Sequence, residues 1–167
     1  MTFADGIEEI ALLVLEPQID LKAVFLLALQ TVQSVLQLSQ CVLFLKDRAS
    51  GGYTASYGTG PLFNGTRGQP LLDPKHKDVF NVCLSRGEDV LIESPEDVRI
   101  RPFIPDWLAA QSQKLPIVLL PIKDLGGPFA IICGISKNKE AFKLVNQFVT
   151  ELRLLRTQLA NTGRAIR

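Results

Sequence analysis

The chain has 167 residues, a length typical of one globular domain. Its 18 basic and 17 acidic residues leave a net charge of +1, which argues against a surface built to bind nucleic acid. No apolar run approaches the ~20 residues of a membrane-spanning helix, and the N-terminus lacks the basic residues that open a signal peptide. Three widely spaced cysteines favour free thiols in the cytoplasm, and a single histidine excludes sites with two His ligands.

The N-terminal third predicts two helices. Residues 5–15 fit a short helix in which Asp5 is the N-cap and Glu8 its capping-box partner, with Pro17 ending it. From Asp20 to residue 38, apolar residues recur at i, i+3 and i+4, the spacing of a longer amphipathic helix.

A hairpin follows. The apolar run CVLFL at 41–45 fits a central strand covered on both faces, and residues 53–57 have strand propensity after a polar, Gly-rich connection. Residues 58–74 are rich in Gly and Pro and are expected to cross the domain as a loop. The sequence predicts antiparallel pairing of the two strands.

The middle of the chain alternates short elements. Residues 75–86 have helical spacing, and Gly87 is expected to end that helix. Residues 89–93 fit a short strand and 94–107 an irregular stretch. A short helix is expected to start at Pro105–Asp106, because proline is favoured in a first turn.

The C-terminal third predicts a second hairpin, 117–122 with 128–136, and a final helix over 139–161. The element order indicates an α+β domain with a mostly antiparallel sheet of about five to six strands. The N- and C-terminal helices are expected on one face of the sheet, and loops and short helices on the other.

Three segments carry a resemblance: CVLFLKDRASGGYTASYGTG, VFNVCLSRGEDVLI and LPIVLLPIKDLGGPFAIICGISKNKEAF. Together with helix 20–38 they resemble a GAF domain of bacterial signalling proteins. IRPFIPDWL is also similar to the GAF-like region that accompanies an HD-related output domain. The resemblance implies one domain over 1–167, with a helical extension at 1–18, a core at 20–160 and a tail at 161–167. It further implies a PAS-like sheet, a small-molecule pocket and a homodimer formed through the terminal helices.

The sequence lacks the motifs of the better-known ligand-binding and catalytic GAF domains. Asn138 and Lys139 imitate the start of a cyclic-nucleotide motif, but no Asp-Glu follows. No cysteine is immediately followed by a histidine, the pair that bilin attachment typically shows. His76, between two lysines, fits a solvated helix start better than a catalytic base. We therefore expect no catalytic residue, no metal and no cofactor.

A ligand pocket is expected beside helix 75–86 and the 99–107 stretch. If that stretch is extended, Arg99 and Arg101 point the same way and could hold a carboxylate or phosphate against aromatic walls. Alternatively, the arginines are solvated or paired with Glu96 and Asp97, the tryptophan covers the core, and Cys83 is core filler. The pocket prediction comprises Phe80, Cys83, Arg99, Arg101, Phe103 and Trp107.

The terminal helices are apolar around much of their circumference, which usually means two burial partners. The residues expected at a homodimer interface are Ile10, Val14, Phe148, Leu152, Leu155 and Leu159, with Arg156 interrupting the apolar stripe. The alternative is a monomer whose terminal helices pack on each other. The sequence thus leaves two functions open: a small-molecule sensor, or a ligand-free dimerisation and interaction module. Neither involves nucleic acid or a membrane.

Overall fold

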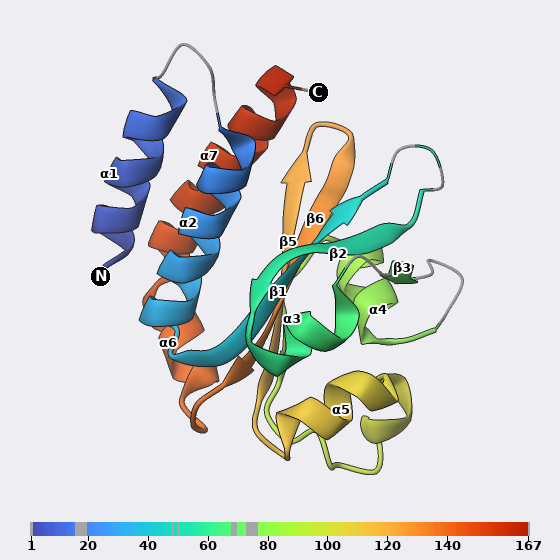
Figure 1. Cartoon of the computed structure of the whole chain (residues 1–167). Helices are drawn as coiled ribbons and strands as arrows, with labels where there is room; N and C mark the ends of the chain where they lie inside the picture. The colour runs from blue at the N-terminus through green and yellow to red at the C-terminus, as the bar shows by residue number, and fades with distance from the viewer. Residues whose placement is uncertain are drawn as a thin grey trace.

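The computed structural model describes residues 2–15, 20–47, 49, 51–67, 70–72 and 77–166, without the side chains of 70–72 and 163–166. Pro17 and His76 lie outside the described residues. Figure 1 shows a central sheet between two layers of helices. No helix in the described ranges is long and apolar enough to cross a bilayer.

The sheet confirms the predicted α+β class. It has six strands in the order β3-β2-β1-β6-β5-β4, and every neighbouring pair is antiparallel. Its strands are β1 (Leu38–Lys46), β2 (Tyr53–Thr59), β3 (Pro70–Leu72), β4 (Val90–Ile92), β5 (Ile117–Asp124) and β6 (Gly127–Ser136). Both predicted hairpins are present, and β3 lies in the stretch expected to be a loop.

The helical layer covers one face. It contains α1 (Phe3–Val14), α2 (Leu21–Val35), α6 (Ala141–Gln147) and α7 (Val149–Ile166). The helix-side core lies among these helices and between them and the sheet, and it includes Ile10, Phe25, Leu29, Leu43, Leu120, Ile132, Leu152, Leu155 and Leu159. The N- and C-terminal helices therefore share one face, as predicted.

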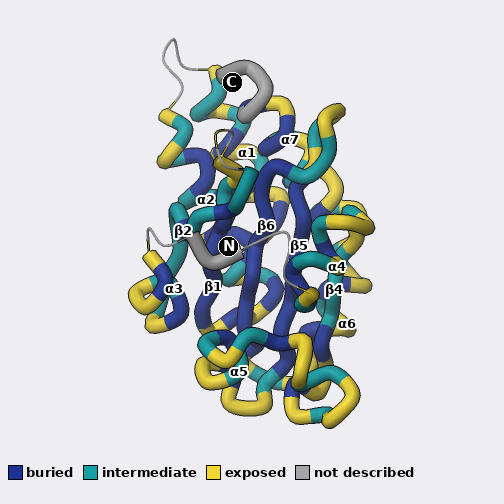
Figure 2. The backbone as a smooth tube through the Cα atoms, turned by 90° about the vertical axis from the view of Figure 1, so that its right-hand side faces the viewer, coloured by how far each residue is buried: buried dark blue, intermediate teal, exposed yellow. Residues whose placement is uncertain are grey.

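The opposite face carries short elements: α3 (Gly60–Thr66), α4 (Val79–Arg86), the 3-10 turn η1 (Arg101–Phe103) and α5 (Asp106–Ser112). They enclose the loop-side core, which includes Val42, Phe44, Leu62, Phe80, Cys83, Ile104, Leu108, Ile131 and Cys133. Figure 2 shows the buried strands running through the centre of the molecule. Alternate residues of β1 enter opposite cores, with Leu43 on one side and Phe44 on the other, so CVLFL is apolar throughout.

Several boundaries differ from the prediction. Thr2, not Asp5, is the N-cap of α1: its hydroxyl accepts from the Asp5 amide at 3.1 Å, and the Asp5 carboxylate accepts from the Thr2 amide at 3.0 Å. Helix α2 ends at Val35, and Gln37 follows in the left-handed region with φ 55°. The N-cap of α2 is Asp20, as expected, accepting from the Ala23 amide at 3.2 Å.

Two helices depart further. The expected helix over 139–161 is divided at Phe148, whose ring packs edge-on against Phe3 with centroids 5.4 Å apart. Helix α3 was expected to be loop. Its Leu62 amide donates to the Gln40 side chain at 2.6 Å, and Leu62 is 1% exposed, so a strand side chain and burial stabilise a Gly- and Pro-containing helix.

Candidate functional site

The predicted pocket region is occupied by an aromatic cluster formed by Phe44 of β1, Phe80 of α4 and Trp107 of α5. The Phe80 and Trp107 rings stack with centroids 5.7 Å apart, and Phe44 meets Phe80 edge-on at 5.8 Å. Phe44 and Trp107 lie 6.3 Å apart. These distances are those of directly packed aromatic pairs, so the three rings contact one another.

Helix α4 fixes Phe80 in this cluster. The Asp78 side chain caps the helix, accepting from the Asn81 amide at 3.0 Å, and Gly87 ends it in the left-handed region with φ 63°, as the sequence predicted. Phe80 is 1% exposed and Cys83 fully buried. Both side chains point into the loop-side core.

The two arginines of the predicted pocket do not converge as expected. Residues 98–100 form a turn, and Arg101 opens η1, because the Asp97 carbonyl accepts from the amides of Ile100 and Arg101 at 2.9 and 2.8 Å. The condition for a common direction of Arg99 and Arg101, an extended 99–101 segment, is therefore not met. Arg101 donates to the Ile104 carbonyl and to Asp106, both at 3.0 Å.

Arg99 follows the alternative interpretation. Its side chain is 85% exposed and pairs with Asp97 at 2.9 Å. Hydrogen bonds from the Arg99 side chain and amide lower the pKa of the Asp97 carboxyl. Each arginine thus has a carboxylate partner of its own. Phe103 is 50% exposed and Trp107 half-buried. The structure brings Phe80, Cys83 and Trp107 into one core and leaves Arg99 on its surface.

The predicted dimer residues divide into two groups. Ile10, Leu152, Leu155 and Leu159 lie in the helix-side core with exposures of 0 to 1%. Of the six predicted interface residues, a second chain would reach only Val14 and Phe148 in this conformation, and both are half-buried. The sequence pattern identified apolar faces correctly, but α7 uses most of its apolar surface against α1, α2 and the sheet.

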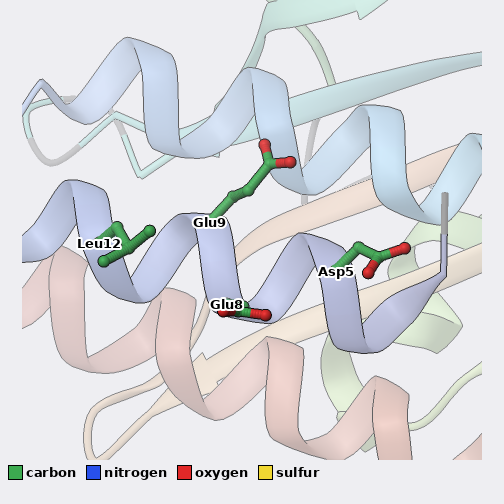
Figure 3. A pocket seen from close by; sticks show the side chains of 4 residues that line it. All are labelled: Asp5, Glu8, Glu9 and Leu12. Carbon is green, nitrogen blue, oxygen red and sulfur yellow. The ribbon is translucent and has the colours of Figure 1, made fainter.

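The outer surface of the helical layer has other apolar residues. Leu12 of α1 is 62% exposed and Leu154 of α7 is 55% exposed. Figure 3 shows Leu12 beside Asp5, Glu8 and Glu9 on the outward side of α1, where they line a hollow of about 360 Å³. This surface combines acidic groups with one exposed leucine, so it suits contact with another macromolecule better than enclosure of a small molecule.

A larger groove, of about 560 Å³, lies between α7, the β5–β6 turn and the segment 87–89. Its charged lining is balanced: the cations are Lys123, Arg153 and Arg156, and the acids are Glu88, Asp89 and Asp124. Arg156 donates to both carboxylate oxygens of Asp89, with Nη2 to Oδ2 at 3.2 Å. Because the charges balance, the lining indicates neither an anionic nor a cationic ligand.

Neither the family models nor the curated proteins include a match to this chain. Solved structures do match. A GAF domain of Aquifex aeolicus nlh2 aligns with TM-score 0.69 and 14% identity, covering 99% of this chain and 97% of that one. The GAF domain of a Coxiella burnetii phosphoenolpyruvate-protein phosphotransferase aligns with TM-score 0.68 and 15% identity, covering 98% and 95%. The chain has the GAF fold.

The GAF fold also occurs in an enzyme. A free methionine-R-sulfoxide reductase of Neisseria meningitidis, solved with its substrate, aligns with TM-score 0.64 and 13% identity, covering 98% of this chain and 91% of that one. In the present GAF-fold chain, burial raises the pKa of Cys41 to about 11 and that of Cys83 to about 12, where the charge of Asp89 contributes. Burial likewise raises the pKa of Cys133. The three thiols therefore stay protonated near neutral pH and are poor nucleophiles.

The sequence argument did not place Phe44 in the aromatic cluster, and it gave Arg156 no partner. A charged residue interrupts the apolar stripe of this GAF-fold chain's last helix, and that interruption was the available signal. Its partner Asp89 lies 67 residues earlier, so the pairing needed the sheet, which brings β4 beside β5, the strand on which α7 packs.

Proposed function

We propose that this GAF-fold chain is a non-catalytic regulatory domain of a signalling protein, acting through contacts with other proteins. The observation that carries the proposal is the aromatic cluster, because Phe44, Phe80 and Trp107 occupy the place where a small-molecule pocket was expected. The protonated, buried thiols support the absence of nucleophilic catalysis by cysteine. The free cysteines are consistent with the cytoplasm.

The competing proposal is a small-molecule sensor. The Neisseria structure with the same fold holds its substrate, so the fold itself accommodates ligands. In this chain, a ligand at the predicted site would have to separate Phe80 from Trp107. The half-buried Trp107 is the ring nearest the surface of the cluster and would have to move.

Native mass spectrometry of the purified chain distinguishes these two proposals. We expect the mass of the protein without any additional small molecule. A compound that co-purifies at one per chain, and is lost on unfolding, would overturn the interaction-module proposal. In that case Trp107→Ala should reduce its occupancy, whereas Trp107→Phe should preserve most of it.

The proposed partner is a second copy of this chain, bound through the outer surface of the helical layer. Leu12 and Leu154 are two of the exposed apolar side chains of this layer, and the partner would cover them. Light scattering should give the mass of two chains, and of one chain for Leu12→Glu or Leu154→Glu. Leu125→Glu, at a 90% exposed position in the β5–β6 turn, is the matched control. A wild-type monomer at high concentration would contradict dimerisation.

A further inference from the structure

The ion pair between Asp89 and Arg156 joins the two sides of the molecule. Asp89 lies just before β4, in the segment that leaves α4, whereas Arg156 belongs to α7 in the helical layer. Arg156 also reaches the Pro121 carbonyl of β5 at 3.4 Å. By contrast, the pairs Arg99–Asp97 and Arg101–Asp106 join residues no more than five positions apart in the chain.

The pair lies in the wall of the groove beside α7 and is partly sheltered from water. The side chains of Arg156 and Asp89 are only 25% and 26% exposed. A charge left unpaired in such surroundings is poorly hydrated, so separating the two groups costs more than separating a surface pair. The two groups are therefore expected to move together or to separate in a distinct second arrangement.

A short path connects this pair to the loop-side core. Helix α4 has 8 residues, buries Phe80 and Cys83, and ends at Gly87. Gly87 lies only two residues before Asp89, so the end of the helix and the carboxylate are joined directly by the chain. A displacement of Phe80 is thus carried through a rigid helix to the segment that bears Asp89.

Strand β4 offers little resistance to that displacement. It has three residues, lies at the edge of the sheet and pairs with β5 alone. Edge positions are held by fewer hydrogen bonds and open more easily than central strands. The carboxylate of Asp89 is consequently fixed more by Arg156 than by the sheet.

We propose that the Asp89–Arg156 pair is a mechanical link through which changes in the loop-side core alter the position of α7. The inference rests on the regulatory function proposed above and names a route of regulation. When the aromatic cluster rearranges, α4 moves, Asp89 moves with it, and α7 either follows or is released. The coupling is reciprocal, so a partner bound to α7 changes the packing of Phe80.

Hydrogen–deuterium exchange tests the link on the purified full chain, without any ligand. Phe80→Leu disturbs the cluster, and exchange is compared in residues 79–92 and 149–166. In the wild-type background we expect faster exchange in both segments, by about fivefold in 149–166. In the Asp89→Asn background, Phe80→Leu should accelerate exchange in 79–92 only.

Arg153→Gln supplies the matched control, because Arg153 lies one turn before Arg156 on the same helix and is exposed. In that background the response of 149–166 to Phe80→Leu should be unchanged. The proposal is overturned if Phe80→Leu changes the exchange of 149–166 equally with and without Asp89. It is also overturned if that exchange does not change in either background. If Phe80→Leu does not fold, Cys83→Ala on the same helix replaces it. Since no ligand or partner enters this experiment, its failure leaves the proposed function standing.

Discussion

Replacing Phe80 with alanine provides the most direct test of the packed loop-side core. The side chain is 1% exposed and contacts two other rings. Removing a buried phenylalanine ring typically costs about 3–5 kcal/mol. An aromatic pair contributes about 0.5–1.5 kcal/mol beyond the burial of its area. The measured cost of replacing a buried phenylalanine with alanine already includes this contribution. We therefore expect a loss of about 3–5 kcal/mol in the free energy of unfolding.

The assay is urea unfolding followed by far-ultraviolet circular dichroism, with thermal unfolding in parallel. For a domain of this size, each kcal/mol lowers Tm by roughly 2–4 °C, so Phe80→Ala should lower it by roughly 6–20 °C. Phe103→Ala is the control, because that ring is 50% exposed in the neighbouring η1 segment. Its cost should stay below about 1 kcal/mol.

The reasoning fails if Phe80→Ala costs less than about 1 kcal/mol, or no more than Phe103→Ala. Such a result would mean that Phe80 is not tightly packed in solution. The space around it would then be available to a ligand, and the small-molecule sensor would become the better proposal.

Three further predictions concern charge, backbone and thiols. Asp89→Asn and Arg156→Gln should each destabilise the chain, and the double variant should cost less than their sum in a urea-unfolding cycle; additive losses would contradict a direct interaction. Gly87→Ala should cost about 1 kcal/mol or more, because its φ of 63° is left-handed. Gly65→Ala, where φ is ordinary and a methyl group meets nothing within 4 Å, should cost less in the same assay. Because burial raises the pKa of Cys83 from 9.0 to about 12, the folded state keeps the thiol proton to a higher pH than the unfolded state. Tm should therefore fall as the pH rises above 9, and it should fall less in Cys83→Ala. Equal slopes of Tm against pH in the two proteins would contradict the raised pKa.

The parts of the fold that the sequence predicted well are those with strong local patterns. The apolar spacing of α2 and the apolar runs of β1, β5 and β6 are long enough to define their structure. Helix α3 was missed because Gly60, Pro61 and Gly65 favour a loop. Its formation depends on Gln40, a residue on a distant strand, and on the burial of Leu62.

The candidate site was predicted less completely for the same reason. Periodicity showed that Phe80 and Cys83 face a core, but not that Phe44 and Trp107 would fill the adjoining space. Strand-like alternation suggested a common direction for Arg99 and Arg101, whereas backbone hydrogen bonds to the Asp97 carbonyl impose a turn. These bonds are local, and the available signal was Asp97, whose carboxylate accepts from the Arg99 amide at 2.9 Å in the kind of turn that aspartate favours.

An apolar stripe on a helix also does not show what the helix packs against. Leu152 looks like an interface residue in the sequence, yet it is 1% exposed because α7 packs on three sides within the chain. Leu152→Glu would consequently place a charge in the helix-side core and report on folding, not on dimerisation.

The chain contains one tryptophan, and that tryptophan lies against Phe80 on one face of the sheet. Its emission is therefore an intrinsic optical probe of that face alone, requiring no dye and no engineered position. The opposite face contributes most of the long helices, whose amide signal dominates a circular dichroism spectrum. Recording both signals in a single stopped-flow unfolding experiment would show whether the two faces of this sheet come apart together or in sequence.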